Sequence, residues 1–125
     1  MNPPKIVICD DDRTITLIVK RLLEKAGFSV FSGKDGKEGL ALVRAHQPSL
    51  MLLDLDMPGK NGIQVLQELQ AAGETPAYLI VLTAHESAED AAQVKSLGAK
   101  EMIVKPFNSS DLVQKLLGIA ASQAL

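Results

Sequence analysis

Four short apolar runs in this sequence are each followed by side chains that could take part in chemistry. These are the carboxylates of Asp10, Asp11 and Asp54, the hydroxyl of Thr83 and the amine of Lys105. If the runs are strands that end at one edge of a sheet, three carboxylates meet there and repel one another unless a cation lies between them. Such an oxygen-rich site suits Mg²⁺, which keeps several waters and accepts phosphate oxygens as ligands.

The same side chains fit phosphoryl transfer. An aspartate carboxylate such as Asp54 can act as a nucleophile toward phosphorus. A metal ion, the Lys105 ammonium and the Thr83 hydroxyl could then neutralise or hydrogen-bond the phosphoryl oxygens. Each residue alone also has a structural explanation, as a helix cap, a turn residue or a solvated lysine, and we expect one of residues 10–12 to cap a helix in any case. Their joint position after four predicted strands favours chemistry.

Apolar runs alternate with segments of helical period along the whole chain. The predicted strands are Lys5–Cys9, Phe28–Phe31, Leu50–Leu53, Tyr78–Leu82 and Glu101–Val104. The predicted helices are a segment with the apolar stripe Ile15, Ile18, Val19, Leu22 and Ala26, then Asp35–Ala45, Asn61–Ala72, Ser87–Leu97 and Asp111–Ala120. This alternation predicts a parallel sheet with right-handed crossovers and helices on both faces. Ligands bind such sheets at the carboxyl ends of the strands.

Length and composition limit the class of protein. The chain has 125 residues, which predicts a single domain over residues 1–125. Apolar residues make up 46% and aromatic residues only 3%, so the core should be aliphatic. A net charge of −2 argues against direct binding of nucleic acid. The lone Cys9 suggests a buried thiol in a reducing cytoplasm, and we expect neither a signal peptide nor a membrane-spanning segment.

The motifs KIVICDDD, LMLLDLDMPGKNG, VLTAH and VKPF, in this order, resemble the receiver domains of bacterial response regulators, including single-domain chemotaxis regulators. The resemblance covers essentially the whole chain. It implies a flavodoxin-like, doubly wound (βα)₅ fold of the α/β class, with a five-stranded parallel sheet in the order 2-1-3-4-5. It also implies a signalling phosphoacceptor of a two-component system and not an enzyme. In that role Asp54 would accept the phosphoryl group, and Asp10, Asp11, Asp54 and the backbone carbonyl of Asp56 would bind Mg²⁺.

The same resemblance implies further roles and partners. Thr83 would move toward the phosphoryl group, Lys105 would pair with it, and the Lys105–Pro106 peptide bond is a candidate for the cis form. Asp56 and His85 would flank the path of the hydrolytic water and tune the phosphorylation lifetime, and their side chains could pair. The phosphodonor would be a sensor histidine kinase or a histidine phosphotransfer protein. The output would pass to a downstream effector or to an output domain missing from this sequence.

One position departs from the family pattern. Three residues before Lys105 the family commonly has Tyr or Phe, whose rotation reports phosphorylation, whereas this chain has Met102. Methionine repacks easily but has no ring to rotate. The helix predicted over Ser87–Leu97 has mainly alanines (Ala88, Ala91 and Ala92) on its apolar side, so little burial should anchor it. Two outcomes are therefore open: the switch is weakly coupled, or backbone motion of this helix carries the signal. We expect the second.

Two other classes share parts of the pattern. LLDLD resembles the nucleophile motif of haloacid-dehalogenase-type phosphatases, but in those enzymes the nucleophilic strand comes first, whereas here the Asp10–Asp11 strand comes first and the Asp54 strand third. A flavodoxin-like FMN binder needs a loop that holds phosphate after the first strand, and three aspartates there would repel it. A small phosphodonor such as acetyl phosphate would separate the three classes, since a receiver should form a slowly decaying phosphoprotein.

Overall fold

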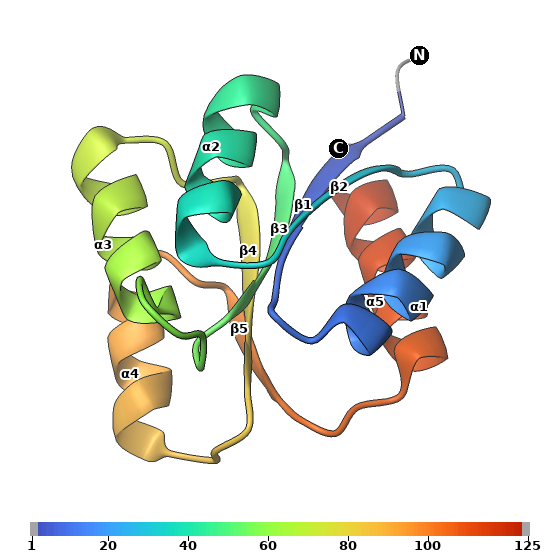
Figure 1. Ribbon diagram of the computed structural model, residues 1–125. Helices are drawn as coiled ribbons and strands as arrows, with labels where there is room; N and C mark the ends of the chain where they lie inside the picture. The colour runs from blue at the N-terminus through green and yellow to red at the C-terminus, as the bar shows by residue number, and fades with distance from the viewer. Residues whose placement is uncertain (1–2, 124–125) are drawn as a thin grey trace.

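Five parallel strands form the centre of the computed structural model, which describes residues 3–123 (Figure 1). The strands are β1 (Lys5–Cys9), β2 (Ser29–Gly33), β3 (Leu50–Asp54), β4 (Tyr78–Thr83) and β5 (Glu101–Val104). They lie in the order β2-β1-β3-β4-β5, and all four pairings are parallel, as the resemblance predicted. The alternation read from the sequence is therefore confirmed.

Helices cover both faces of this sheet. They are α1 (Arg13–Lys25), α2 (Gly36–His46), α3 (Gly62–Ala72), α4 (Ala88–Ser96) and α5 (Ser109–Ser122). Figure 1 shows α1 and α5 on one face and α2, α3 and α4 on the other. Within residues 3–123, no helix has the length and apolar character needed to cross a membrane.

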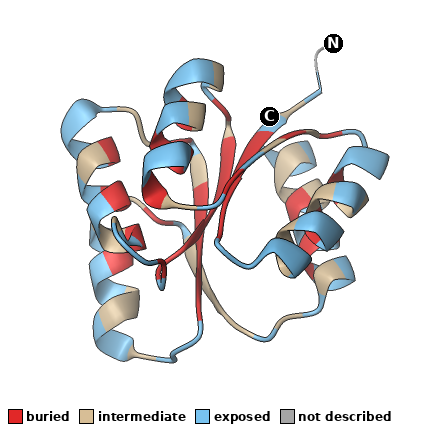
Figure 2. Ribbon diagram, viewed as in Figure 1, coloured by how far each residue is buried: buried red, intermediate tan, exposed pale blue. Residues whose placement is uncertain are grey.

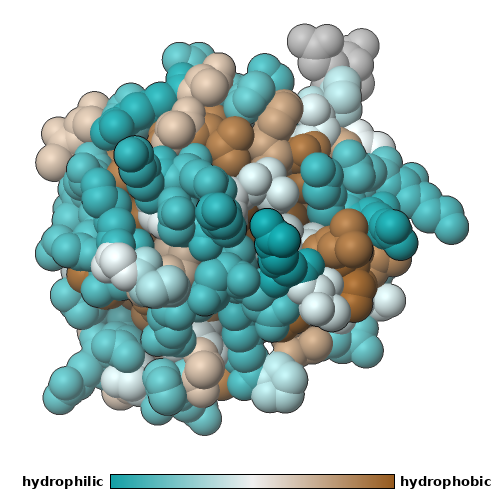
Figure 3. Space-filling view, viewed as in Figure 1, coloured by the Kyte–Doolittle hydropathy of each residue, from teal (hydrophilic) through white to brown (hydrophobic). Residues whose placement is uncertain are grey.

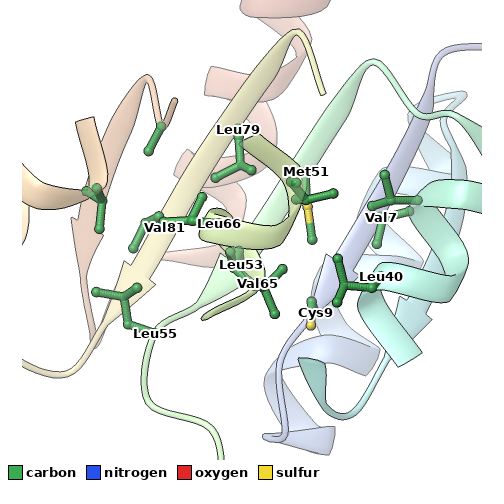
Figure 4. Close-up of a cluster of buried hydrophobic side chains, with 14 of the residues drawn as sticks. Val7, Cys9, Leu40, Met51, Leu53, Leu55, Val65, Leu66, Leu79 and Val81 are labelled. Carbon is green, nitrogen blue, oxygen red and sulfur yellow. The ribbon is translucent and has the colours of Figure 1, made fainter. Parts of the chain in front are cut away.

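The core consists of two aliphatic layers, one on each face of the sheet (Figure 2). Alternate residues of the central strands enter opposite layers, so every residue of β3 is buried. The layer beneath α2, α3 and α4 includes Val7, Cys9, Leu40, Met51, Leu53, Val65 and Leu66, which Figure 4 shows packed together. The layer beneath α1 and α5 includes Ile6, Ile8, Val19, Leu23, Leu50, Leu52, Leu112 and Leu116. Burial on both faces explains the continuous apolar runs in the sequence.

A side chain caps the N-terminus of each of the five helices within residues 3–123. Asp12, Asp35, Asn61, Ser87 and Asn108 each accept a hydrogen bond from the backbone N–H three residues further on. Each cap satisfies an N–H group that the helix itself leaves unpaired. The expectation that one of the first three aspartates caps a helix is confirmed by Asp12.

The structure corrects the predicted apolar face of α1. Ile18 and Ala26 were expected to face the core, but both are exposed, whereas Leu23 is fully buried. Val19 and Leu23, four residues apart, lie on the same side of the helix and pack toward the sheet. Leu17 and Ile18 consequently face solvent, and Figure 3 shows an apolar patch over α1 on an otherwise largely hydrophilic surface.

The weak anchoring expected for α4 is confirmed, but the residue that anchors it and the start of β2 differ from the prediction. Ala88 and Ala92 are exposed, and Val94 is the buried residue of α4. The second strand begins at Ser29, not at Phe28, because the Phe28 N–H donates to the Leu23 carbonyl at the end of α1 while its ring is buried in the core.

A close backbone contact fixes the start of α3 against the end of β3. Gly62, the first residue of α3, donates its N–H to the Leu55 carbonyl at 3.2 Å. A Cβ atom at position 62 would lie 2.6 Å from the Asp54 carbonyl oxygen and 2.7 Å from the Leu55 Cα. Only glycine allows this approach, so the helix and the strand end that carries Asp54 are positioned by one another.

Gly62→Ala should therefore lower the free energy of unfolding by about 1–3 kcal/mol, because the added methyl group overlaps backbone atoms. Urea denaturation measures the change. Gly118→Ala is the matched control: Gly118 lies in α5 with nothing within 4 Å of an added Cβ, so this variant should gain up to about 1 kcal/mol from helix propensity. Equal effects of the two substitutions would contradict the close contact.

Candidate functional site

The residues predicted to act together meet at the carboxyl edge of the sheet. Asp10 follows β1, Asp54 ends β3, Thr83 ends β4 and Lys105 follows β5. One carboxylate oxygen from each of Asp10, Asp11 and Asp54 lies within 4.8 Å of the others. Asp10 and Asp54 are buried, and Asp11 is exposed. The cluster therefore opens to solvent on the Asp11 side.

Lys105 forms ion pairs with both buried carboxylates. Its Nζ atom lies 2.9 Å from Asp10 Oδ2 and 3.4 Å from Asp54 Oδ2. Burial alone would lower the pKa of Lys105, but the hydrogen bond and charge of Asp10, together with Asp54, raise it above its ordinary value. The ammonium is therefore firmly protonated. Lys105 is held by its backbone N–H, which donates to the Thr83 carbonyl at 2.7 Å, and the Lys105–Pro106 bond is cis, as predicted.

Asp54 has a carboxylate that is harder to ionise than usual. Burial raises its pKa from 3.8 to about 6, and the nearby negative charge of Asp10 acts in the same direction. The Asp56 N–H, which donates to Asp54 Oδ1 at 3.0 Å, and the Lys105 ammonium oppose this rise. Asp54 is thus mostly ionised at neutral pH, which is the form that a nucleophile requires.

The three consecutive aspartates after β1 have different environments. Asp10 Oδ1 accepts the Asp12 N–H at 2.9 Å, which orients the buried carboxylate. Asp12 Oδ1 caps α1 through the Ile15 N–H. Asp11 is therefore left with an exposed carboxylate beside Asp10 and Asp54.

This donor set fits a small, hard divalent cation. Three carboxylate oxygens converge with one ammonium as counter-charge, so the cluster carries excess negative charge. Oxygen ligands of this kind, with room for water on the exposed side, suit Mg²⁺. The Asp56 carbonyl remains a predicted ligand.

Thr83 and the loop after it contact the Asp56 side chain. The Thr83 hydroxyl donates to Asp56 Oδ2 at 3.2 Å, and the Ala84 N–H donates to the same oxygen at 3.0 Å. The His85 N–H donates to Thr83 Oγ1 at 3.1 Å. Asp56 thus contacts Thr83 and Ala84, and the suggested pairing of its side chain with that of His85 stays a prediction. Sequence reasoning missed the Ala84 N–H, since a backbone group carries no residue-type signal.

Other candidates occupy structural positions. Met102 lies half-buried in β5, opposite Val81, and packs against the core layer beneath α2, α3 and α4. Burial raises the pKa of the Cys9 thiol to about 12, so it is inert as a nucleophile. The His46 ring stacks on Phe31 with centroids 3.7 Å apart.

Comparison with known proteins identifies the class. Residues 6–117 match the family described as the response regulator receiver domain, so the chain belongs to that family. It is 43% identical over 115 residues to the transcriptional regulatory protein CpxR of Klebsiella pneumoniae, and 42% identical to CpxR of Escherichia coli K12. Each match covers 92% of this chain and 48% of the relative, so the chain spans about half the length of these curated relatives.

Solved structures agree with this assignment. A CheY-like receiver domain protein from Methanospirillum hungatei matches with a TM-score of 0.88 and 29% identity, covering 98% of this chain and 97% of that one. The Francisella response regulator 1452 receiver domain matches with a TM-score of 0.86 and 27% identity, over 98% and 99% of the two chains. The family match decides against both the haloacid-dehalogenase-type phosphatase and the FMN binder.

The raised pKa of Asp54 predicts a pH-dependent effect of Asp54→Asn. A carboxyl group whose pKa is higher in the folded protein stabilises the fold at low pH and loses this contribution as the pH rises through about 6. The variant keeps an oxygen that accepts the Asp56 N–H but has no charge. Without metal, it should exceed the wild type by about 1–3 kcal/mol in unfolding free energy at pH 7.5, and by less at pH 4.5. Urea denaturation with a chelator present tests this, and a difference independent of pH would contradict it.

Proposed function

We propose that this domain takes a phosphoryl group onto Asp54 from a phosphohistidine of a sensor histidine kinase or a histidine phosphotransfer protein. The observation that carries the proposal is the buried Asp54 carboxylate, paired with Lys105 and grouped with Asp10 and Asp11. An Asp54 oxygen forms a bond to phosphorus while the phosphorus–nitrogen bond of the donor breaks. The electron pair of that bond stays on the imidazole nitrogen, which takes a proton from solvent.

The residues of the site divide the work of this transfer. Asp10, Asp11, Asp54 and the Asp56 carbonyl would hold Mg²⁺, which when bound supplies positive charge to the phosphoryl oxygens. The Lys105 ammonium is already within ion-pair distance of Asp54 and neutralises charge on the transferred group. The Thr83 hydroxyl, at the end of the neighbouring strand, donates a hydrogen bond to it.

The proposal extends to lifetime, output and location. The domain assists its own phosphotransfer and dephosphorylation and turns over no separate substrate; Asp56 and His85 tune the lifetime of the phosphoryl group. Because its curated relatives are about twice as long and are named as transcriptional regulatory proteins, an output domain or a separate effector receives the signal. A cytoplasmic location fits the free, buried Cys9 thiol.

The response proposed for phosphorylation is a change of the face formed by α4, β5 and α5. Met102 lies on β5 and packs against the core layer that includes Val94 of α4. It can refill space left by Thr83 only loosely, because its side chain has no fixed shape. The signal is therefore carried mainly by displacement of α4 and of residues 84–87 before it.

Mg²⁺ should raise the thermal stability of the wild-type domain with a dissociation constant of roughly millimolar, because the ion keeps much of its hydration shell. Asp11→Asn should weaken this response at least several-fold, because it removes one ligand of the cluster. Asp12→Asn is the matched control: it removes an adjacent exposed carboxylate, and asparagine caps a helix equally well. Melting curves against Mg²⁺ concentration measure the effect, and a wild type that does not respond contradicts the metal site.

Acetyl phosphate with Mg²⁺ should add one phosphoryl group, about 80 Da, to the wild-type chain in intact-mass spectrometry, as aspartyl-phosphate chemistry requires. Asp54→Asn should abolish the added mass, and so should a chelator. Asp35→Asn serves as the control, since Asp35 is a helix cap that asparagine can replace. Labelling that persists in Asp54→Asn would refute the assignment of the phosphoacceptor.

A further inference from the structure

Two hydrogen-bond donors from the loop after β4 converge on one oxygen atom of Asp56. The Thr83 hydroxyl lies 3.2 Å and the Ala84 N–H 3.0 Å from Asp56 Oδ2. Thr83 Oγ1 also accepts the His85 N–H at 3.1 Å. A hydroxyl has a single proton to donate, and in this arrangement the proton of Thr83 is directed at the Asp56 carboxylate.

The same donors lie next to the proposed phosphoacceptor. Asp54 pairs with Leu82 across β3 and β4, so Thr83 is the next residue along the neighbouring strand. Asp56 follows Asp54 by two residues, and its N–H donates to Asp54 Oδ1 at 3.0 Å. Positions 54 and 56 thus both lie beside the strand end that carries the two donors.

We infer that Asp56 is a positioning residue whose carboxylate holds Thr83 and Ala84 in the unphosphorylated protein and competes with a phosphoryl group on Asp54 for both donors. The inference rests on the proposed function. A phosphoryl group brings strong acceptor oxygens and negative charge, whereas Thr83 can donate to only one acceptor at a time. Phosphorylation must therefore replace the Asp56 contact before the loop can move.

Two further features of Asp56 affect this exchange, one in each direction. Asp56 is exposed, so its released carboxylate passes directly into water and leaves no charge buried. Its negative charge also repels an incoming phosphoryl group, which favours the resting position of the loop. Asp56 therefore acts through its side chain as a brake on switching, independently of any role of its backbone carbonyl in binding metal.

The test is a titration with beryllofluoride, a phosphoryl mimic, at saturating Mg²⁺, followed by amide NMR of residues 84–87. Asp56→Ala removes both the acceptor and the charge, and should lower the midpoint about three- to tenfold relative to the wild type. Asp56→Asn keeps an acceptor oxygen without the charge, so its midpoint should lie between those of Asp56→Ala and the wild type. Before any probe is added, the Ala84 amide should shift and exchange faster in Asp56→Ala, but much less in Asp56→Asn.

Two controls separate a specific contact from general electrostatics. Glu86→Gln removes an exposed carboxylate from the same loop and should change the midpoint less than Asp56→Asn does. In a Thr83→Ala background, Asp56→Ala should lower the midpoint less than it does in the wild type, because one of the two donors for which Asp56 and the phosphoryl group compete is already lost.

The outcomes distinguish this inference from the proposed function. Three results would each overturn the role of Asp56 while phosphorylation of Asp54 stands. The first is an unchanged or raised beryllofluoride midpoint in Asp56→Ala, and the second is a midpoint lowered as much in Glu86→Gln as in Asp56→Asn. The third is a midpoint that Asp56→Ala lowers as much in the Thr83→Ala background as in the wild type. A wild type that neither binds beryllofluoride nor gains mass from acetyl phosphate overturns the proposed function, and this inference with it.

Discussion

Asp10 and Asp54, two buried carboxylates, share the single ammonium of Lys105, and the character of the site follows from that shared ion pair. Two negative charges taken out of water need compensation, and one ammonium gives only half of it. Burial and the negative charge of Asp10 therefore raise the pKa of Asp54. The uncompensated negative charge also favours a cation beside the exposed carboxylate of Asp11. The cluster is therefore ready to gain positive charge and then to accept an anionic group.

Stability for such a site has to come from elsewhere in the fold. All five residues of β3, Leu50–Asp54, are buried between two aliphatic layers, and the four residues before Asp54 contribute apolar contacts to both. Close contact of Gly62 with the Asp54 backbone then fixes the strand end itself. Because the strand end cannot move, the Asp54 carboxylate stays close to those of Asp10 and Asp11 although the three repel one another.

The sequence predicted the strands and the residues at their ends, which depend on residue type and on the period of the apolar residues. It predicted less well which face of a helix is buried and which side chains form hydrogen bonds. Buried strands and the meeting of Asp10, Asp54 and Lys105 at one edge followed from apolar runs and the residues after them. The inward face of α1 was misjudged because several stripes are possible among its many apolar residues, and only packing against the sheet selects Val19 with Leu23. The bond from Thr83 to Asp56 depends on two side-chain rotamers in different loops, which no spacing along the chain encodes.

The helices differ in how many buried residues hold them against the sheet, and α4 has the fewest. Leu23, Leu112 and Leu116 anchor α1 and α5 to the same core layer. In contrast, α4 contributes one buried residue, Val94, and it is tied to α3 by a bond from the Gln70 amide to the Ser96 carbonyl at 3.0 Å. The loop that precedes α4 is the one whose donors contact Asp56. A new charge on Asp54, as proposed, would therefore act on the least anchored helix of the domain, through a loop held by a side chain that is exposed to water.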